Sequence, residues 1–315
     1  MINFTHNNHL KFGWGSGLYN FDDKNEQFWE TVGPAEYIPV SYKEECLRAA
    51  RLISEAATKP IMIFLSGGVD SEVVARSFID IGVYFEVVTT NILYNGEIVN
   101  VHDTRYTSEF IKHHNLKSHT VDIEYKDVVD RLTKIRETQN SSTPYYKISV
   151  AYLCQIEMFE QFCQDYHCVI GAGGGGRSLV RYRANGGPSD KYGVYCDDSS
   201  SNVAAFELSF RASADVTLFF WYTPEMLLAW LLDTDVSHWI KYEKALAGAH
   251  SRMNNHALKS FVFYKIWPDM EIREKLGGFE KISEFKELFY DSFYNDDKCF
   301  VQIDSKDLLE MLMPQ

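Results

Sequence analysis

The sequence has no excess of positive charge. Its 31 Lys and Arg residues stand against 44 Asp and Glu residues, which gives a formal net charge of −13 at pH 7. Non-specific binding to nucleic acid or to an anionic membrane depends on Lys and Arg side chains that neutralise phosphate groups. The balance therefore argues against bulk nucleic-acid binding and against attachment to a membrane surface.

A long uninterrupted apolar run is also absent. The most apolar stretch, VTLFFWYTPEMLLAWLL at 216–232, is broken by Pro224 and Glu225. Since a spanning helix needs about 20 consecutive apolar residues, this stretch is predicted to form a buried strand–turn–helix or a helix pair. The first residues, MINFTHNNHLKFGWG, have neither a charged start nor an apolar core, so we expect no secretion signal and a cytoplasmic protein.

The cysteines and histidines lack the spacing of metal sites. No C-x-x-C pair occurs, and no cysteine lies near histidine at zinc spacing. We predict buried free thiols in a reducing compartment. His113, His114 and His119 have no partners at ligand spacing and are predicted to be surface residues. The six cysteines are Cys46, Cys154, Cys163, Cys168, Cys196 and Cys299.

What the sequence does contain is an alternation of apolar strands with helical segments. Near-continuous apolar strands between helices are typical of a parallel sheet covered on both faces. We therefore predict an α/β fold with a parallel twisted sheet and helices on both of its faces. The predicted strands lie at 61–65, 83–93, 117–124 and 167–170, with helices at 41–59, 69–79, 103–115 and 148–166.

Three regions are expected along the chain. Residues 1–40 are rich in glycine turns and aromatic residues and are predicted to form an extension of hairpins or irregular structure. Residues 41–185 would form the α/β core. After about residue 205 the pattern turns helical and aromatic, so 186–315 are predicted to form a mainly helical lobe packed on the core.

The turn after the first predicted core strand, SGGVDS at 66–71, is the strongest functional signal. Ligands of a parallel sheet bind beyond the carboxyl ends of its strands. Gly67 and Gly68 let the backbone approach a ligand, Ser66 and Ser71 add hydroxyl donors, and the next helix presents its positive end. This combination is suited to phosphate, and Asp70 beside phosphate indicates Mg²⁺ between them.

The same six residues resemble the pyrophosphate-binding loop of the PP-loop ATP pyrophosphatases. That resemblance implies a HUP/PP-loop fold and cleavage of ATP between its α- and β-phosphates, with adenylation of a substrate. It implies that Asp70 is both a catalytic residue and the Mg²⁺ ligand. The implied ATP-binding residues here are Leu65, Ser66, Gly67, Gly68, Asp70 and Ser71.

Further segments resemble the synthetase domain of asparagine synthetase and β-lactam synthetase, over about residues 41–280. The segment ECLRAARLISEAATKPIMIFL at 45–65 has the order and spacing of that domain before the loop. In the late segment NNHALKSFVFYKIWPDMEIREKLGGF at 254–279, the family places a lysine after a proline near the ATP phosphates. Lys275 is our catalytic candidate for that role, with Lys259 as the second choice, because a lysine would neutralise charge on departing pyrophosphate.

The glycine-rich segment HCVIGAGGGGRSLVRY at 167–182 departs from the family pattern. Gly173 stands in place of a catalytic Glu, Gly176 in place of a second metal-binding Asp, and Arg177 in place of an acid. We interpret the segment as a second wall of the ATP site, with Arg177 also catalytic. The residues assigned to that wall are Gly171, Gly173 and Gly174, and those assigned to a clamp on the second substrate's carboxylate or phosphate are Arg177, Arg181 and Arg183.

The glycine run also fits G-x-G-x-x-G and, with Arg177 replacing Lys, a P-loop. Both matches are weak because a glycine run satisfies them almost automatically. The position after the first core strand, where such fingerprints normally lie, is already taken by the Ser66–Ser71 loop.

Three functions follow from these patterns. The first is an ATP-dependent ligase that adenylates a small-molecule carboxylate and joins it to an amine. Ile2 stands where a glutaminase nucleophile would be and only about 60 residues precede the loop, so no glutaminase domain is expected and a partner could supply the amine or ammonia. The second is a PP-loop enzyme that modifies a nucleobase or tRNA. The third is a non-catalytic ATP-binding protein that has lost its second-loop acids. ATP and Mg²⁺ are the expected cofactors.

Overall fold

The structure is a computed structural model of the 315-residue chain. It describes residues 2–6, 10–14, 28–32, 35–138, 150–171, 177–181, 192–196, 215–237, 255–271, 273, 282 and 299–303.

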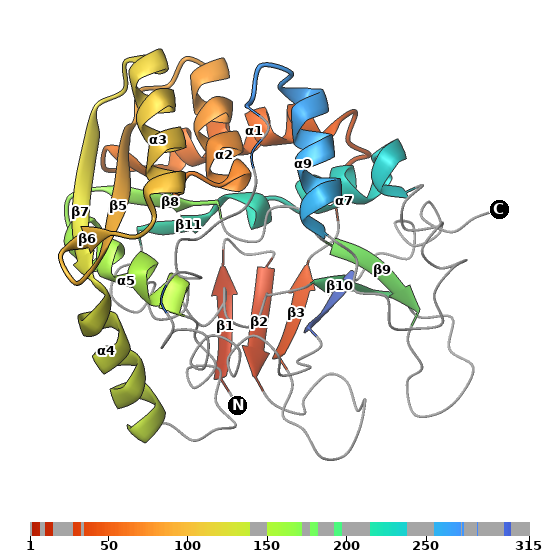
Figure 1. Cartoon of the computed structure of the whole chain (residues 1–315). Coiled ribbons are helices and arrows are strands. Elements are labelled where there is room, and N and C mark those ends of the chain that lie inside the picture. Colours follow the sequence, from red (N-terminus) through yellow and green to blue (C-terminus); the bar gives the residue numbers. More distant parts are fainter. Residues whose placement is uncertain are drawn as a thin grey trace.

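A mostly parallel sheet forms the centre of the α/β fold (Figure 1). Its parallel strands run in the spatial order β11–β8–β4–β5–β7. The short strand β6 pairs antiparallel with the end of β5. The strands are β4 (Ile61–Phe64), β5 (Glu86–Tyr94), β6 (Glu97–Ile98), β7 (Ser118–Glu124), β8 (His167–Ile170) and β11 (Val216–Leu218).

This strand order has a reversal point at β4. The chain passes from β4 outward through β5 to β7, and then returns to the other side of β4 for β8 and β11. Ligand crevices of open α/β sheets form beyond the carboxyl end of the strand at such a point. The Ser66–Ser71 segment directly follows β4.

Helices cover both faces of the sheet, which confirms the predicted fold class. Figure 1 shows α1, α2 and α3 on one side of it and α4 and α5 on the other. The helices are α1 (Tyr42–Ala56), α2 (Val69–Asp80), α3 (Val101–His114), α4 (Tyr125–Thr138), α5 (Val150–Phe162), α7 (Pro224–Leu232) and α9 (Asn255–Ile266).

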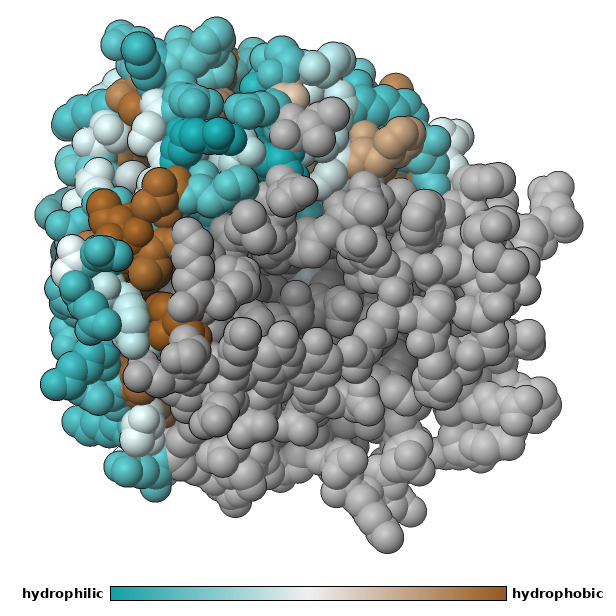
Figure 2. All heavy atoms as spheres, in the orientation of Figure 1, coloured by the Kyte–Doolittle hydropathy of each residue, from teal (hydrophilic) through white to brown (hydrophobic). Residues whose placement is uncertain are grey.

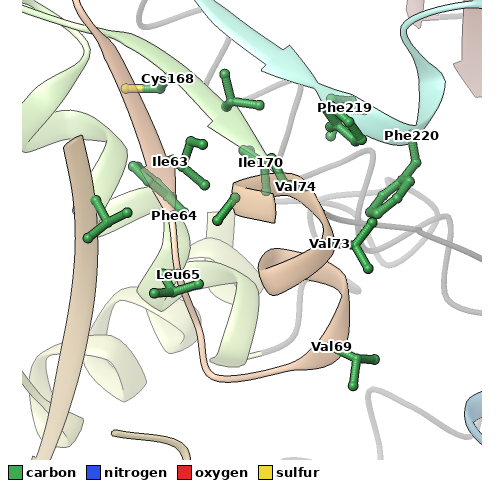
Figure 3. Close-up of a cluster of buried hydrophobic side chains, with 14 of the residues drawn as sticks. Ile63, Phe64, Leu65, Val69, Val73, Val74, Cys168, Ile170, Phe219 and Phe220 are labelled. Atoms are coloured by element: carbon green, nitrogen blue, oxygen red, sulfur yellow. The ribbon is translucent and has the colours of Figure 1, made fainter. Parts of the chain in front are cut away.

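One part of the hydrophobic core lies between β4, β8, α2 and the segment after β11 (Figure 3). All four residues of β4 are buried, as expected for a strand with a layer on each face. Phe219 and Phe220 form the 3₁₀ turn η2 (Phe219–Trp221) and pack edge to face with ring centroids 5.2 Å apart. Each fully buried side chain of this size contributes about 1.5–3 kcal/mol of hydrophobic free energy. This packing therefore holds β4 in place, and with it the start of the Ser66–Ser71 loop.

The segment 216–232 is a strand–turn–helix, one of the two forms predicted for it. β11 leads through η2 into α7, which begins with Pro224 behind the N-cap Thr223. The Thr223 hydroxyl accepts a hydrogen bond from the Met226 N–H at 3.2 Å. None of the helices in the described ranges has the length and hydropathy needed to cross a bilayer.

A second sheet joins distant parts of the chain, in the order β1–β2–β3–β12–β10–β9. Its pairs are antiparallel except β12 with β3. The predicted N-terminal hairpins are therefore part of a larger sheet. The boundary expected between 185 and 186 falls between two paired strands, β9 and β10. The strands are β1 (Ile2–His6), β2 (Leu10–Trp14), β3 (Phe28–Val32), β9 (Arg177–Arg181), β10 (Tyr192–Cys196) and β12 (Cys299–Ile303).

The surface over the upper helices is largely hydrophilic, whereas brown atoms gather at the left of Figure 2, where Figure 1 draws the β5–β6 turn. Ile98 and Val101 are among the exposed apolar residues, at 40% and 54% exposure. Four of the six cysteines are free and buried, as predicted: Cys46, Cys154, Cys163 and Cys168. Burial raises the pKa of the Cys154 and Cys168 thiols to about 12, which leaves them unreactive at neutral pH.

Candidate functional site

The candidate site is the turn from β4 into α2. Leu65 is buried and its N–H donates to the Val88 carbonyl at 2.9 Å, so the chain leaves the sheet only after this residue. Four residues later α2 begins at Val69. The loop is therefore short and anchored at both ends by the core.

Gly67 is required by both conformation and space. Its φ of +85° lies in the left-handed region, and an added Cβ would lie 2.4 Å from the Asp103 carbonyl oxygen in the first turn of α3. Any side chain would therefore be strained and would collide with backbone. This close contact seats the loop against α3.

The N-cap residue of α2 provides no side-chain cap. Its N-cap is Gly68, which has no side chain to accept from the first N–H groups of the helix. The N–H groups of Val69 and Asp70, together with the positive end of the helix, are therefore suited to an anion.

The two serines shape the loop through hydrogen bonds with each other and with the backbone. The Ser71 hydroxyl donates to the Gly68 carbonyl at 2.9 Å and accepts from the Ser66 N–H at 3.1 Å. The two hydroxyl oxygens are 3.1 Å apart. The predicted direct role of both hydroxyls on phosphate stays a prediction, since in this structure they bond within the loop.

Asp70 pairs with Lys259, a residue of α9 that is distant in sequence. The Lys259 ammonium donates to the Asp70 carboxylate, and its side chain is 10% exposed against 25% for Asp70. α9 contacts α2 along this side (Figure 1). The structure thus brings our second-choice lysine to the loop. The first choice, Lys275, lies outside the described residues.

A buried ion network follows Asp70 on α2. Glu72, 3% exposed, accepts from Arg76 at 2.7 Å and from the Arg273 guanidinium. Arg76 also donates to Asp269 at 2.6 Å. Arg273 donates in addition to the Gly67 carbonyl at 2.7 Å. The sequence pattern points to none of these four residues, because only the fold brings Asp269 and Arg273 onto α2.

The end of β8 lies against the same turn of α2. A Cβ on Gly171 would lie 3.0 Å from the Val74 side chain and 3.1 Å from the Asp70 backbone. This places Gly171 beside the loop, as the predicted second wall requires. Gly173, Gly174, Gly176 and Arg183 lie outside the described residues. Arg177 and Arg181 begin and end strand β9, which pairs with β10.

The residues present fit a polyphosphate better than a metal held by protein alone. The N–H groups at the start of α2 and the side-chain-free Gly67 form an anion cradle, and Lys259 adds positive charge. Within the ranges that the structure describes, no three His, Cys, Asp or Glu side chains are grouped to hold a metal. A Mg²⁺ ion needs only one or two carboxylates when phosphates complete its ligands, so Asp70 could hold one together with bound phosphate.

Comparison with known proteins gives only distant structural likenesses. No family model and no curated relative matches the sequence. An NH3-dependent NAD synthetase from Campylobacter jejuni has 11% identity and a TM-score of 0.32 over 76% of this chain and 100% of its own. An NMN synthetase from Francisella tularensis has 12% identity and a TM-score of 0.33 over 76% of this chain and 99% of its own.

A predicted subunit of tRNA methyltransferase from Methanocaldococcus jannaschii has 13% identity and a TM-score of 0.29, over 70% of this chain and 94% of its own. Scores at this level assign neither a family nor a function. The function is therefore argued from the loop and its surroundings.

Proposed function

We propose that the chain binds ATP with Mg²⁺ at the Ser66–Ser71 loop and cleaves ATP between its α- and β-phosphates to adenylate a substrate. The observation that carries this proposal is the loop itself. It combines a reversal-point position, a helix N-terminus whose N-cap residue is glycine, and a second glycine that admits no side chain. Such a turn offers backbone donors to a pyrophosphate group rather than to an uncharged ligand.

Individual residues have distinct parts in this proposal. The backbone N–H groups of Val69 and Asp70 bind the β- and γ-phosphates. Lys259, held beside the loop by Asp70, neutralises the negative charge that grows on departing pyrophosphate. Asp70 holds Mg²⁺ together with phosphate oxygens, and the metal supplies further charge neutralisation.

The substrate is proposed to be a small-molecule carboxylate whose adenylate is attacked by an amine, forming an amide-type bond. The carboxylate substrate and the amide-type bond are inferred from the sequence resemblance to the asparagine synthetase branch. We propose that ATP is also surrounded by Lys275, Gly173 and Gly174. Arg177 is proposed to be catalytic. The amine is free, belongs to the substrate, or comes from a separate partner.

Product analysis with labelled ATP tests the proposal. We expect α-labelled ATP to yield AMP and γ-labelled ATP to yield pyrophosphate when Mg²⁺ and a pool of carboxylates are present. The same pool should support exchange of labelled pyrophosphate into ATP, and Asp70→Asn should abolish both. ADP and inorganic phosphate as products would refute α,β-cleavage. Pyrophosphate release that needs RNA or a nucleobase instead of a carboxylate would assign the acceptor to nucleic-acid modification.

A further inference from the structure

Arg273 contacts the Ser66–Ser71 loop at the Gly67 carbonyl. Its side chain is 6% exposed, and one guanidinium nitrogen donates to the Gly67 carbonyl at 2.7 Å. A second nitrogen pairs with the Glu72 carboxylate, and the guanidinium lies 4.5 Å from the centre of the Tyr106 ring. The loop with the first turn of α2, and α3, therefore both hold this one group.

The contact fixes the orientation of a single peptide group. In a trans peptide the C=O and the following N–H point in opposite directions. Because the Gly67 carbonyl points to Arg273, the Gly68 N–H points into the loop, where it donates to the Ser66 hydroxyl at 3.4 Å. If this peptide rotated, its carbonyl would turn toward the position of the anion and repel it.

The acid that holds Arg273 is itself firmly placed. Glu72 is buried in the first turn of α2 and also accepts from Arg76, which is tied to Asp269. A guanidinium has several N–H donors in a fixed plane, so it can donate to a carboxylate and to a carbonyl at the same time. A lysine ammonium is a compact charge and lacks this planar arrangement of donors.

We propose that Arg273 is a positioning residue that keeps the Gly67–Gly68 peptide in the anion-binding orientation. The proposal rests on the proposed function of the loop and assigns to it a residue that does not itself touch the ligand.

The test compares Arg273→Lys with Arg105→Gln in the full chain. Arg105 makes a matched control because its guanidinium also lies over Tyr106, at 4.6 Å, but its side chain is 54% exposed and contacts Glu271 instead of the loop. Calorimetric titration with inorganic pyrophosphate and Mg²⁺ measures binding. Amide hydrogen exchange of the peptide covering 64–72 measures the loop.

We expect Arg273→Lys to weaken pyrophosphate binding about tenfold or more, the size of one lost charged hydrogen bond. Loop exchange should accelerate in this variant and stay unchanged in Arg105→Gln, with both variants folded by circular dichroism. If Arg273→Lys does not fold, the double variant Glu72→Gln/Arg273→Met replaces it in the comparison. This variant removes both charges of the buried pair, so neither is left unpaired by the loss of the other.

Loop exchange equal to wild type in a folded Arg273 variant would overturn the proposal, and so would unchanged pyrophosphate binding. Failure of the wild-type chain to bind pyrophosphate or ATP would refute the proposed function of the loop. In that case the exchange comparison would still decide whether Arg273 positions the loop.

Discussion

At the scale of single residues, Gly67 gives the sharpest requirement in the loop. Gly67→Ala should destabilise the chain by at least about 3 kcal/mol, since left-handed strain adds to a collision with the α3 backbone. The variant should also lose ATP binding because the loop must move away from α3. Urea unfolding and ATP titration measure the two effects.

Gly82 supplies the control for this substitution. Its φ of +70° carries a similar strain, but nothing lies within 4 Å of an added Cβ. Gly82→Ala should therefore cost about 1–2 kcal/mol and leave ATP binding unchanged. Equal effects of the two substitutions on stability would show that the close approach of Gly67 to Asp103 has no energetic importance.

The Asp70–Lys259 pair should behave as a coupled unit. Removing one partner leaves the other partly buried without its opposite charge, so Asp70→Asn and Lys259→Gln should each destabilise by about 1–3 kcal/mol. The double variant should cost clearly less than the sum of the two, by about 1 kcal/mol or more. Additive losses in a double-mutant cycle by urea unfolding would count against the pairing.

At the scale of elements, the start of β5 holds a buried acid that the sequence did not reveal. Glu86 accepts from His119 on β7 at 2.6 Å, from Lys117 at 2.8 Å and from the Tyr166 hydroxyl at 3.0 Å. Burial would raise the pKa of Glu86, but these hydrogen bonds outweigh it and lower the pKa to about 2. His119, predicted to be a surface residue, is thus a partner of this acid.

This depressed pKa predicts acid sensitivity. A carboxyl group with a lower pKa in the folded state stabilises the fold above its unfolded pKa of about 4.5 and loses that contribution as pH falls toward about 2. We expect the loss to be about 1–2 kcal/mol, because Lys117 is largely exposed and screened. Glu86→Gln should flatten the dependence of unfolding free energy on pH between 4.5 and 2. The same slope in wild type and variant would refute this assignment.

Several elements could be predicted because their signals are local. β4 is an apolar run that is soon followed by the paired glycines Gly67 and Gly68. α1 follows the N-cap Ser41, whose hydroxyl accepts from the Glu44 N–H at 3.2 Å. Segment 216–232 carries Pro224 just inside its helix. In each case the deciding interaction lies within a few residues.

Other elements could not be predicted because their partners are distant. β12 pairs with β3 from the other end of the sequence, and β9 with β10 across a boundary placed between two domains. Strand pairing depends on which segments the fold brings together, so a short isolated run such as 299–303 carries little signal of its own. The region after 186, expected to be mainly helical, therefore includes β10 and β12 of the second sheet as well as β11 of the first.

At the scale of the whole molecule, the candidate site is assembled from regions about 200 residues apart. The loop itself is evident in the sequence, whereas Lys259, Asp269 and Arg273 reach it only through the packing of α9 and the following turn on α2. Pair interactions of this kind leave no local spacing to recognise. The loop could therefore be predicted in advance. Lys259 was a candidate through the family resemblance, whereas Asp269 and Arg273 were not predicted.

The central claim is that the first N–H groups of α2 bind the phosphates of ATP, and one substitution addresses them directly. Val69 is the first residue of α2, where proline is favoured, and Gly68 before it has φ −77° and ψ 155°, which a following proline permits. Val69→Pro should remove one donor and leave the helix in place.

The measurement is calorimetric titration of ATP and Mg²⁺ into the full chain, wild type against Val69→Pro, with circular dichroism to confirm equal helix content. The account predicts that wild type binds ATP and that the variant binds it about tenfold more weakly. Equal affinity in the two proteins, or no binding by wild type, would contradict it.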